Sequence, residues 1–335
     1  MTQSSLSTHS FLEITPDRVL AMVERTGVKA TGRVLQLNSM ENRVFEVEIE
    51  CENPTTKYDQ FRVIKFLRPG RWSLESVEEE HAFLQALVAN EVPVAAPLLF
   101  ESGKTIARDP ESGILAVVFP RIGGRSPDEL SQEDYRKMGR LIARMHVVGK
   151  SLSPQRRPEL TPETYGSDNI DWLYNQSVIP LELENRYLDL AAKATDLSKD
   201  LFAGIELQAI HGDCHLGNVL SGTGGLFFVD FDDMVVAPKI QDLWLLVSGT
   251  DEYGIQQMKW LLQGYEDMAR IDRDQLKLVE VLRFLRYVYY SAWIAKRWSD
   301  PAFPRSFPHF GTHDYWLGQI RDVEVQLHAI KEIVG

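Results

Sequence analysis

The sequence predicts an α+β fold of two lobes, in which an N-terminal lobe with an antiparallel sheet precedes a larger helical C-terminal lobe. Three observations lead to this expectation. The chain has 335 residues, and a single hydrophobic core stops growing at about 250–300 residues. Apolar and polar residues alternate over residues 33–67, as they do in half-buried strands. Beyond residue 127 the pattern becomes mostly helical, so strands and helices are segregated along the chain.

The N-terminal lobe is expected to begin with a short helix over residues 16–27. Thr15 is a candidate cap, Pro16 occupies the first helical position, and Gly27 ends the helix. Two strand-like runs follow, VFEVEIE and FRVIKFL, and an Asn-Pro pair between them marks a turn. These runs supply strands of the predicted sheet.

One more helix and one more strand complete this lobe. The stretch LESVEEEHAFLQALVANE has helical spacing with prolines after its end, and ILAVVFP is typical of a buried strand. The Gly-Gly pair and the proline of IGGRSP, residues 122–127, break the pattern and indicate a linker. We therefore expect lobes over residues 1–120 and 128–335, joined by a hinge over residues 121–127.

Helices dominate the predicted C-terminal lobe. The first is LSQEDYRKMGRLIARMHVVG, a long one lies near residues 181–202, and several more follow. The segment QAIHGDCHLGNVLSGTGGLFFVDFDD interrupts them with two short apolar strands around a glycine-rich turn. The proline-rich segment SDPAFPRSFP, residues 299–308, breaks the last helices.

Charge excludes two classes of partner. The chain has 36 basic and 48 acidic side chains, which gives a formal net charge of −12. A general nucleic-acid binder, or a protein that binds anionic membranes, needs a basic face, so neither partner is expected. A local basic pocket for a small anion such as ATP is still compatible with this charge.

Cysteine usage and hydropathy point to a cytoplasmic, soluble protein. The two cysteines lie far apart in the sequence, and a single disulfide between them would stabilise a chain of this length poorly. This cysteine usage favours a reducing compartment. The start of the chain lacks the pattern of a secretory signal. The longest apolar run, residues 114–119, is too short to span a bilayer. Nothing in the sequence signals an assembly larger than a monomer.

The strongest chemical signal is HGDCHLGN at residues 211–218, followed by FFVDFDD at 227–233. Asp213 and Asn218 have the D-x-x-x-x-N spacing of a kinase catalytic loop, and Asp230 lies twelve residues further on, where an apolar strand ends. Phosphoryl transfer needs one carboxylate to orient the incoming hydroxyl and accept its proton, and it needs an amide oxygen and a second carboxylate to hold Mg²⁺ against ATP. We therefore expect Asp213 and Asp230 to be catalytic, and Asn218 and Asp230 to bind Mg²⁺.

Other interpretations of this segment stay open. It could be a buried polar turn. His211, Cys214 and His215 could suggest zinc, although no second ligand cluster with suitable spacing exists in the sequence. A nucleophilic pair of Cys214 and His215 is disfavoured because adjacent side chains rarely face one another in a loop. For His211 we expect a structural role that fixes the loop, while Asp232 and Asp233 could be solvated or could bind metal.

A second requirement is a cation for the nucleotide phosphates. Lys65 lies inside the apolar run FRVIKFL, where a lysine is costly unless it is paired. Glu80 shares the apolar face of the following helix and is the expected partner of Lys65. Glu78 and Glu79 point elsewhere on that helix and are expected to form a solvated face. An unremarkable alternating strand is the alternative for Lys65 taken alone.

The glycine-rich phosphate loop of many kinases is missing. The chain has LNSMENRVFEV at that place, where Asn38, Ser39 and Asn42 could offer donors in a tight turn. An ordinary hairpin turn is the alternative. Adenine is expected to dock near Phe119 to Ile122, where backbone groups could bind its edge.

Together these residues resemble the aminoglycoside phosphotransferase and choline kinase superfamily, which has a protein-kinase-like fold. His-Gly-Asp in place of His-Arg-Asp, the aspartate at the end of the following strand and the lack of an A-P-E segment all fit. Longer stretches, namely LNSMENRVFEV, EEHAFLQALVANEVPVAAP and YYSAWIAKRWSDPAFPRSFP, resemble a bacterial stress-response branch of it from about Phe11 to Ile320. The last stretch is the most specific, because no catalytic rule demands it.

This resemblance implies a cytoplasmic serine/threonine kinase that uses ATP and Mg²⁺ and phosphorylates a protein substrate in stress protection. Carried over by motif position, Asp213 is the proton acceptor, and Asn218 and Asp230 are magnesium ligands. Ser39 lies at the ATP phosphates, and Lys65 forms an ion pair with Glu80. The N-terminal lobe then binds the nucleotide, and the C-terminal lobe provides catalysis and binds the acceptor.

The acceptor itself stays open between a protein hydroxyl and a small alcohol of the aminoglycoside, choline or homoserine type. A nucleotide-binding regulator without catalysis is a third hypothesis. An aromatic C-terminal helix could form a cation-binding box or could be core, and its residues are Tyr287, Tyr289, Tyr290, Trp293 and Trp298. Basic residues there could line a cleft for an acidic acceptor or form a salt-bridged face: Arg283, Arg286, Lys296 and Arg297.

Overall fold

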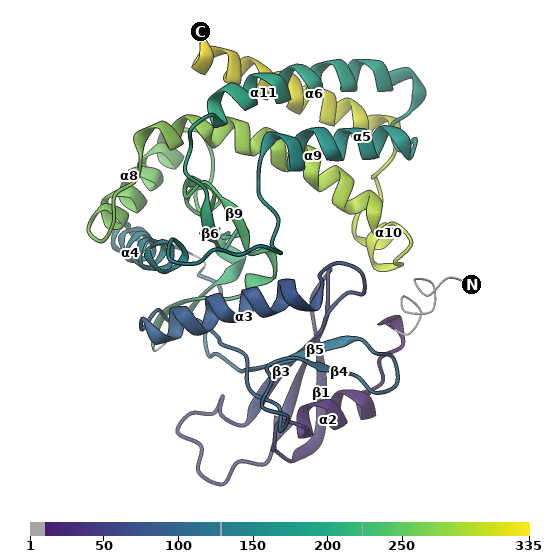
Figure 1. Cartoon of the computed structure of the whole chain (residues 1–335), viewed down its shortest axis with the longest axis vertical. Helices are drawn as coiled ribbons and strands as arrows, with labels where there is room; N and C mark the ends of the chain where they lie inside the picture. The colour runs from purple at the N-terminus through teal and green to yellow at the C-terminus, as the bar shows by residue number, and fades with distance from the viewer. Residues whose placement is uncertain (1–10, 128, 223) are drawn as a thin grey trace.

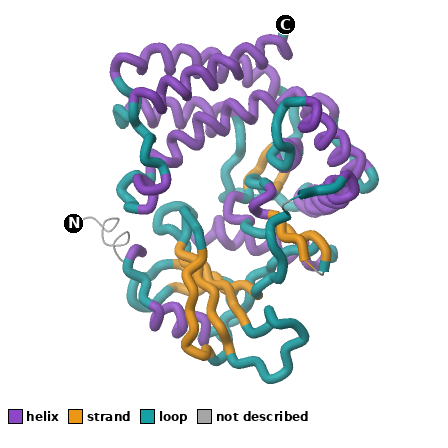
Figure 2. Tube along the Cα trace, turned by 180° about the vertical axis from the view of Figure 1, so that it is seen from behind, coloured by secondary structure: helices purple, strands orange, loops and turns teal. Residues whose placement is uncertain are grey.

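The computed structural model describes residues 11–127, 129–222 and 224–335, and it has the α+β architecture that the sequence predicts. A sheet with its flanking helices forms one end of the molecule, and a bundle of helices forms the other end (Figures 1 and 2). Residues 1–10, on which the expectation about a secretory signal rests, lie outside the described residues.

The N-terminal sheet is antiparallel and has the strand order β1-β2-β3-β5-β4. Its strands are β1 (Ala30–Leu37), β2 (Arg43–Ile49), β3 (Phe61–Phe66), β4 (Ala107–Arg108) and β5 (Leu115–Pro120). Successive side chains of a strand point to opposite faces. On the central strand β3, Ile64 and Phe66 therefore enter the core under helix α2 (Pro16–Glu24), and Lys65 projects from the other face.

Helix α3 (Leu74–Ala89) covers the face of the sheet that carries Lys65. Ser73 caps its start, because the hydroxyl accepts a hydrogen bond from the Ser76 N–H at 3.1 Å. The helix buries the predicted apolar face, which includes Val77, Phe83, Leu84 and Leu87. Helix α2 ends at Glu24, earlier than expected, and Gly27 with φ +81° lies in the turn that follows.

The C-terminal part is a helical bundle. Its long helices are α4 (Gln132–Gly149), α6 (Leu181–Phe202), α8 (Glu252–Glu266), α9 (Val279–Lys296) and α11 (His313–Val334). Shorter helical elements are Pro162–Ser167, α5 (Asp168–Asn175), α7 (Ile240–Trp244), Arg273–Leu278 and α10 (Ala302–Ser306). Helix α4 packs closely on α8, since a Cβ at Gly139 would lie 2.1 Å from the Leu261 carbonyl oxygen.

Two small antiparallel pairs of strands carry the HGDCHLGN and FFVDFDD segments. The predicted hairpin is β7 (Val219–Gly222) with β8 (Gly225–Phe228), and a second pair, β6 (Gln208–Ile210) with β9 (Val235–Ala237), was not expected. The β6–β9 pair brings the start of the first segment beside the end of the second. The two motifs therefore meet in space.

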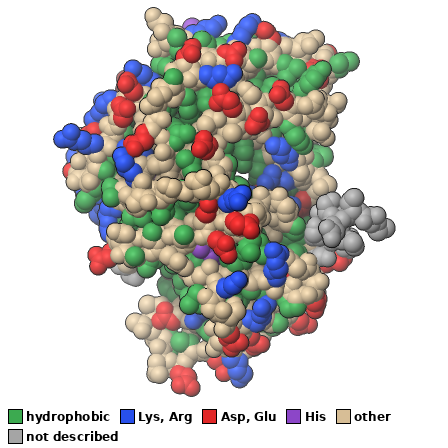
Figure 3. Space-filling model, in the orientation of Figure 1, with side chains coloured by type: hydrophobic (Ala, Val, Ile, Leu, Met, Phe, Trp, Pro, Cys, Tyr) green, Lys and Arg blue, Asp and Glu red, His purple; other side chains and the backbone are tan. Residues whose placement is uncertain are grey.

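Acidic and basic side chains are interspersed over the face that Figure 3 shows. Within the described ranges, each helix is too short or too polar to cross a bilayer.

Candidate active site

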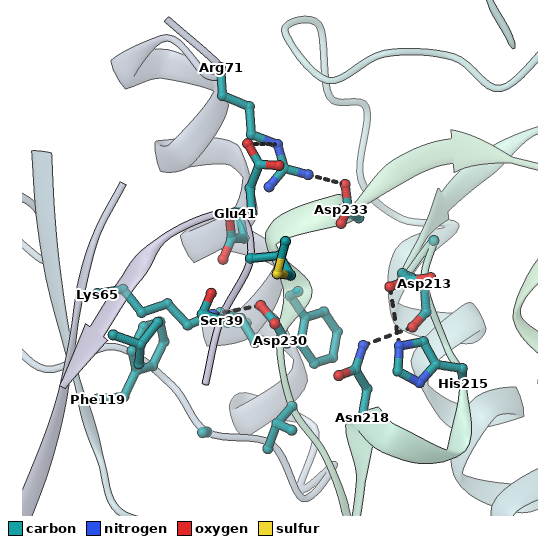
Figure 4. A pocket seen from close by; sticks show the side chains of 18 of the residues that line it. Ser39, Glu41, Lys65, Arg71, Phe119, Asp213, His215, Asn218, Asp230 and Asp233 are labelled. Carbon is teal, nitrogen blue, oxygen red and sulfur yellow. Dashed lines mark hydrogen bonds and ion pairs between the residues drawn. The ribbon is translucent and has the colours of Figure 1, made fainter. Parts of the chain in front are cut away.

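A cavity of about 620 Å³ is lined by residues from both parts of the chain. Most of the candidate site residues line it, namely Ser39, Lys65, Glu80, Phe119, Ile122, Asp213, Asn218 and Asp230. Figure 4 labels six of them: Ser39, Lys65, Phe119, Asp213, Asn218 and Asp230. Asn42 is the exception, and its expected contact with a cofactor is wrong. Its amide is buried and is held by the Asp232 carboxylate and by the Arg68 N–H, so it anchors the β1–β2 turn instead of facing the cavity.

The backbone of the loop that follows β6 is held in place by the buried carboxylate of Asp242. Asp242 accepts hydrogen bonds from the backbone N–H groups of His211 at 2.9 Å and Gly212 at 2.8 Å. Gly212 has φ +88°, and a Cβ there would lie 2.1 Å from the Asp233 carbonyl oxygen. His211 is fully buried and its Nε2 lies 3.0 Å from the Val229 carbonyl oxygen. The structure thus gives His211 the loop-fixing contacts that were expected.

Asp213 lies between Arg286 and His215. Its carboxylate lies 3.1 Å from Nη1 of Arg286 on α9 and 3.4 Å from Nε2 of His215. Burial alone would raise the pKa of Asp213, but the hydrogen bond from His215 and the charge of Arg286 hold that pKa well below its ordinary value. Asp213 is therefore ionised at neutral pH and is suited to orient a hydroxyl.

Asn218 precedes β7 and Asp230 follows β8, so both lie at the open end of the β7–β8 hairpin, where the Val229 N–H donates to the Asn218 carbonyl at 3.0 Å. The Asn218 amide nitrogen donates to the Asp213 carbonyl at 3.0 Å, which leaves its amide oxygen as the group able to bind a cation. Asp230 follows β8 in the left-handed region, with φ +65° and ψ +66°, and its side chain is about half exposed at 49%. Aspartate is among the few residues that adopt this conformation with ease.

Lys65 is paired, but its expected partner is wrong. Its Nζ lies 2.6 Å from Oδ1 of Asp230 (Figure 4). The same amine lies 3.0 Å from Oδ1 of Asp232. Glu80 instead holds Arg157, whose Nη2 lies 2.5 Å from Oε2, and both side chains are buried. Burial alone would lower the pKa of Lys65, but the charges of Asp230, Asp232 and the more distant Glu80 raise it above its ordinary value, so the amine is charged.

One further acidic residue, Glu79, differs from expectation, and for Asp232 one of the two alternatives is excluded. Glu79 does not belong to a solvated face, because it accepts hydrogen bonds from the backbone N–H groups of residues 155–157 at 2.7–3.0 Å. Asp232 is not solvated either, since it is buried against Lys65. Asp233 is bonded to the Arg71 guanidinium at the edge of the cavity. These carboxylates have structural partners that no local pattern reveals.

The zinc interpretation finds no support in the structure. Among the described residues, no group of three or more histidines, cysteines, aspartates and glutamates is arranged to hold a metal ion. Cys214 is buried and away from the cavity lining. One carboxylate and one amide oxygen, from Asp230 and Asn218, do fit the hard-ligand preference of Mg²⁺, which takes its other ligands from phosphates and water.

Two groups of residues in the cavity lining differ in chemistry. Phe119 to Ile122 form the first, and there the Ile122 carbonyl accepts a hydrogen bond from Arg121 Nη1 at 2.6 Å. Tyr289, Tyr290 and Trp293 of α9 form the second, and Tyr290 stacks on Trp293 with ring centroids 5.4 Å apart.

The other aromatic and basic residues singled out in and just after α9 lie elsewhere. Tyr287 and Trp298 are outside the cavity lining. Arg283 is paired with Glu280, and Lys296 donates to the Asn169 side chain. Of the four basic residues of this region, Arg286 is the one that lines the cavity. The salt-bridged alternative therefore holds for most of them.

Replacing His215 with glutamine should make stability less dependent on pH. Hydrogen bonding to Asp213 raises the pKa of His215. A raised pKa means that the stabilising contribution is fully present below the ordinary imidazole pKa of about 6.5 and is lost as the pH rises through the raised value. The melting-temperature difference between wild type and His215→Gln should thus be larger at pH 6 than at pH 9, as measured by differential scanning fluorimetry. An equal difference at both pH values, or the same trend in His309→Gln at an exposed histidine, would contradict this assignment.

Comparison with known proteins places these features in a known group. Residues 34–279 match the model of the family described as phosphotransferase enzyme family (APH). Stress response kinase A of Escherichia coli (strain K12) is 34% identical over 331 residues, covering 97% of this chain and 96% of that protein. The serine/threonine protein kinase RdoA of Salmonella typhimurium (strain LT2) is 35% identical over 315 residues, covering 92% of each chain.

Solved structures share the fold at lower identity. An amicoumacin kinase, hAmiN, in complex with AMP-PNP, Ca²⁺ and Ami has a TM-score of 0.71 and 19% identity, covering 93% of each chain. The choline kinase LicA from Streptococcus pneumoniae has a TM-score of 0.58 and 17% identity, covering 93% of this chain and 98% of that one. The likeness confirms the kinase-like fold.

Proposed function

The chain belongs to the phosphotransferase enzyme family, and we propose that it is a serine/threonine protein kinase that transfers the γ-phosphoryl group of ATP to a protein hydroxyl. The observation that carries the proposal is the meeting of Lys65, Asp213, Asn218 and Asp230 around one cavity. Relatives named stress response kinase A and serine/threonine protein kinase RdoA support a protein acceptor and a role in stress. We place the enzyme in the cytoplasm, as a monomer.

In this proposal Asp213 orients the acceptor hydroxyl and takes up its proton. Phosphoryl transfer passes through a loose transition state, so positioning contributes more than strong basicity. The low pKa of Asp213 agrees with such a role. Lys65 exchanges its contact with Asp230 for the nucleotide phosphates, and Asp232 still holds its amine in place.

Asn218 and Asp230 would hold Mg²⁺, which fits their amide and carboxylate oxygens. The bound ion would neutralise charge on the triphosphate and so let phosphates approach the aspartates of the cavity. Ser39 in the β1–β2 turn lines the same cavity and is proposed to face the phosphates. Phe119 and Ile122 are proposed to contact adenine.

A small-molecule alcohol is the second candidate acceptor. Solved structures with this fold are named as kinases of amicoumacin and choline, which are small molecules. In this chain, Tyr290 and Trp293 line the same cavity, and they are the aromatic residues that would contact a small cationic acceptor. A regulator without catalysis is disfavoured, because Lys65, Asp213 and the two proposed metal ligands are all present.

An acceptor panel tests the proposal. The protein is incubated with γ-labelled ATP and Mg²⁺ together with a mixture of bacterial proteins, choline, homoserine or an aminoglycoside, and the label is followed by electrophoresis and chromatography. We expect label on serine or threonine of protein, with Mg²⁺ required. Transfer only to a small alcohol would overturn the protein acceptor, and ATP left intact under all conditions would overturn the kinase assignment.

A further inference from the structure

The turn between β1 and β2 has no glycine, yet it lies where phosphates are proposed to bind. We call residues 38–42 the phosphate turn. Its own side chains stiffen it, because Ser39 Oγ accepts from the Asn42 N–H at 3.3 Å and the Asn42 amide bonds to Asp232 and to the Arg68 N–H. Side-chain anchors of this kind hold a backbone that glycine would leave free.

A second set of contacts reaches the phosphate turn from the helical part of the molecule. Glu41 accepts hydrogen bonds from Nε1 of Trp293 at 2.8 Å and from Nε and Nη2 of Arg297 at 2.6 and 2.9 Å. The side chains of Glu41 and Arg297 are 12% and 13% exposed. Burial alone would raise the pKa of Glu41, but the arginines Arg71 and Arg297 lower it, so the carboxylate is charged.

The proline-rich segment after α9 adds a third anchor. Arg68 donates to the carbonyls of Met40 at 3.1 Å and Glu41 at 3.0 Å, and it also bonds to Asp300 at 2.8 Å. Asp300 is 2% exposed, and Met40 packs against the cluster formed around Phe303. The stretch YYSAWIAKRWSDPAFPRSFP, which no catalytic rule demands, thus supplies the contacts that cross to the phosphate turn.

We infer that Glu41 and the residues 293–303 form a bracket that positions the phosphate turn for ATP, in place of a flexible glycine-rich loop. Glu41 is a positioning residue, since it acts through the turn that carries Ser39. A turn held before the ligand arrives loses less conformational freedom on binding. This inference rests on the proposed function only for the identity of the ligand, because the bracket is present in the free chain.

For Glu41→Ala, electrostatics and positioning predict opposite effects on the affinity for ATP. The substitution removes a negative charge near the phosphates, so charge alone predicts tighter binding of ATP. Loss of the bracket predicts weaker binding, by about tenfold, because the competent turn becomes a minor conformation. Glu41→Gln keeps an oxygen that can accept a hydrogen bond from Arg297. Its affinity for ATP should therefore lie between those of the wild type and Glu41→Ala.

The matched control is Glu79→Ala. Glu79 also joins the two parts of the chain, through backbone N–H groups of residues 155–157, but it lies away from the phosphate turn. Two measurements are made on each full-length variant: amide hydrogen exchange of residues 38–42 without ligand, and the Kd of ATP with Mg²⁺ by calorimetry.

We expect amide exchange in the phosphate turn to be about tenfold faster in Glu41→Ala than in the wild type, and to change little in Glu79→Ala. The Kd for ATP should rise in Glu41→Ala and stay unchanged in Glu79→Ala. Wild-type exchange in Glu41→Ala, or unchanged or tighter binding of ATP, would overturn the bracket. If the wild type bound no ATP, the proposed function would fail, whereas exchange at residues 38–42 would still decide whether the bracket exists.

Discussion

Asp213→Asn is expected to lower the rate of phosphoryl transfer by about a thousandfold or more, because removing one member of a catalytic unit has effects of that size. Asparagine keeps the size of the side chain, but it can neither take up a proton nor form an ion pair with Arg286, which lies 3.1 Å away. Binding of ATP should change little, since Asp213 is proposed to contact the acceptor. ATP consumption and calorimetric binding measure the two effects separately.

The control for this variant is Asp189→Asn, which removes a charge from an exposed position on α6. Its turnover should equal that of the wild type. Turnover of Asp213→Asn within tenfold of the wild type, with both variants folded by circular dichroism, would contradict the role proposed for Asp213.

Asp230→Asn should abolish most of the metal-dependent rate, again by about a thousandfold at a fixed Mg²⁺ concentration, since a metal ion supplies several kcal/mol of transition-state stabilisation. Asparagine is the right substitution because the residue has φ +65°, a conformation that asparagine also adopts. Raising the Mg²⁺ concentration should restore part of the rate. Lys65 should stay in place, because Asp232 still contacts it at 3.0 Å.

Turnover as a function of Mg²⁺ concentration checks this prediction, with Asp189→Asn as the charge control. The same Mg²⁺ dependence in Asp230→Asn and the wild type would show that Asp230 holds no essential metal.

The segregated sheet and helices could be predicted because they rest on local signals. Alternation marks β2 and β3, helical spacing marks α3, and Ser73 caps that helix. The short pair β6–β9 was missed, since each strand has only three residues and alternation cannot show in so short a run. Its role, to bring two distant segments together, is a property of the fold.

The residues of the candidate site could be predicted better than their partners. Periodicity placed Glu80 on the buried face of α3, which is right. It could not show that Arg157, from the loop after α4, would reach Glu80 and leave Lys65 to Asp230 and Asp232. Which charged side chains form ion pairs depends on tertiary packing.

Residues that close the cavity were missed for the same reason. Glu41 lies in a turn in which only the asparagines and the serine suggest phosphate contacts, and Arg71 follows β3 outside any recognised motif. Both meet their partners across more than a hundred residues, at Arg297 and Asp233. One signal for these contacts was present in the sequence. The stretch from residue 289 onward closely resembles the stress-response branch of the family, although catalysis does not require it, and such a specific segment indicates a structural role.

A crystal structure with a non-hydrolysable ATP analogue and Mg²⁺ tests the whole arrangement at once. We expect the triphosphate in the cavity beneath the phosphate turn, Lys65 moved from Asp230 to a phosphate oxygen, and Mg²⁺ bound by Asn218 and Asp230. An analogue bound outside this cavity, or Lys65 still on Asp230 with the metal held elsewhere, would contradict the account.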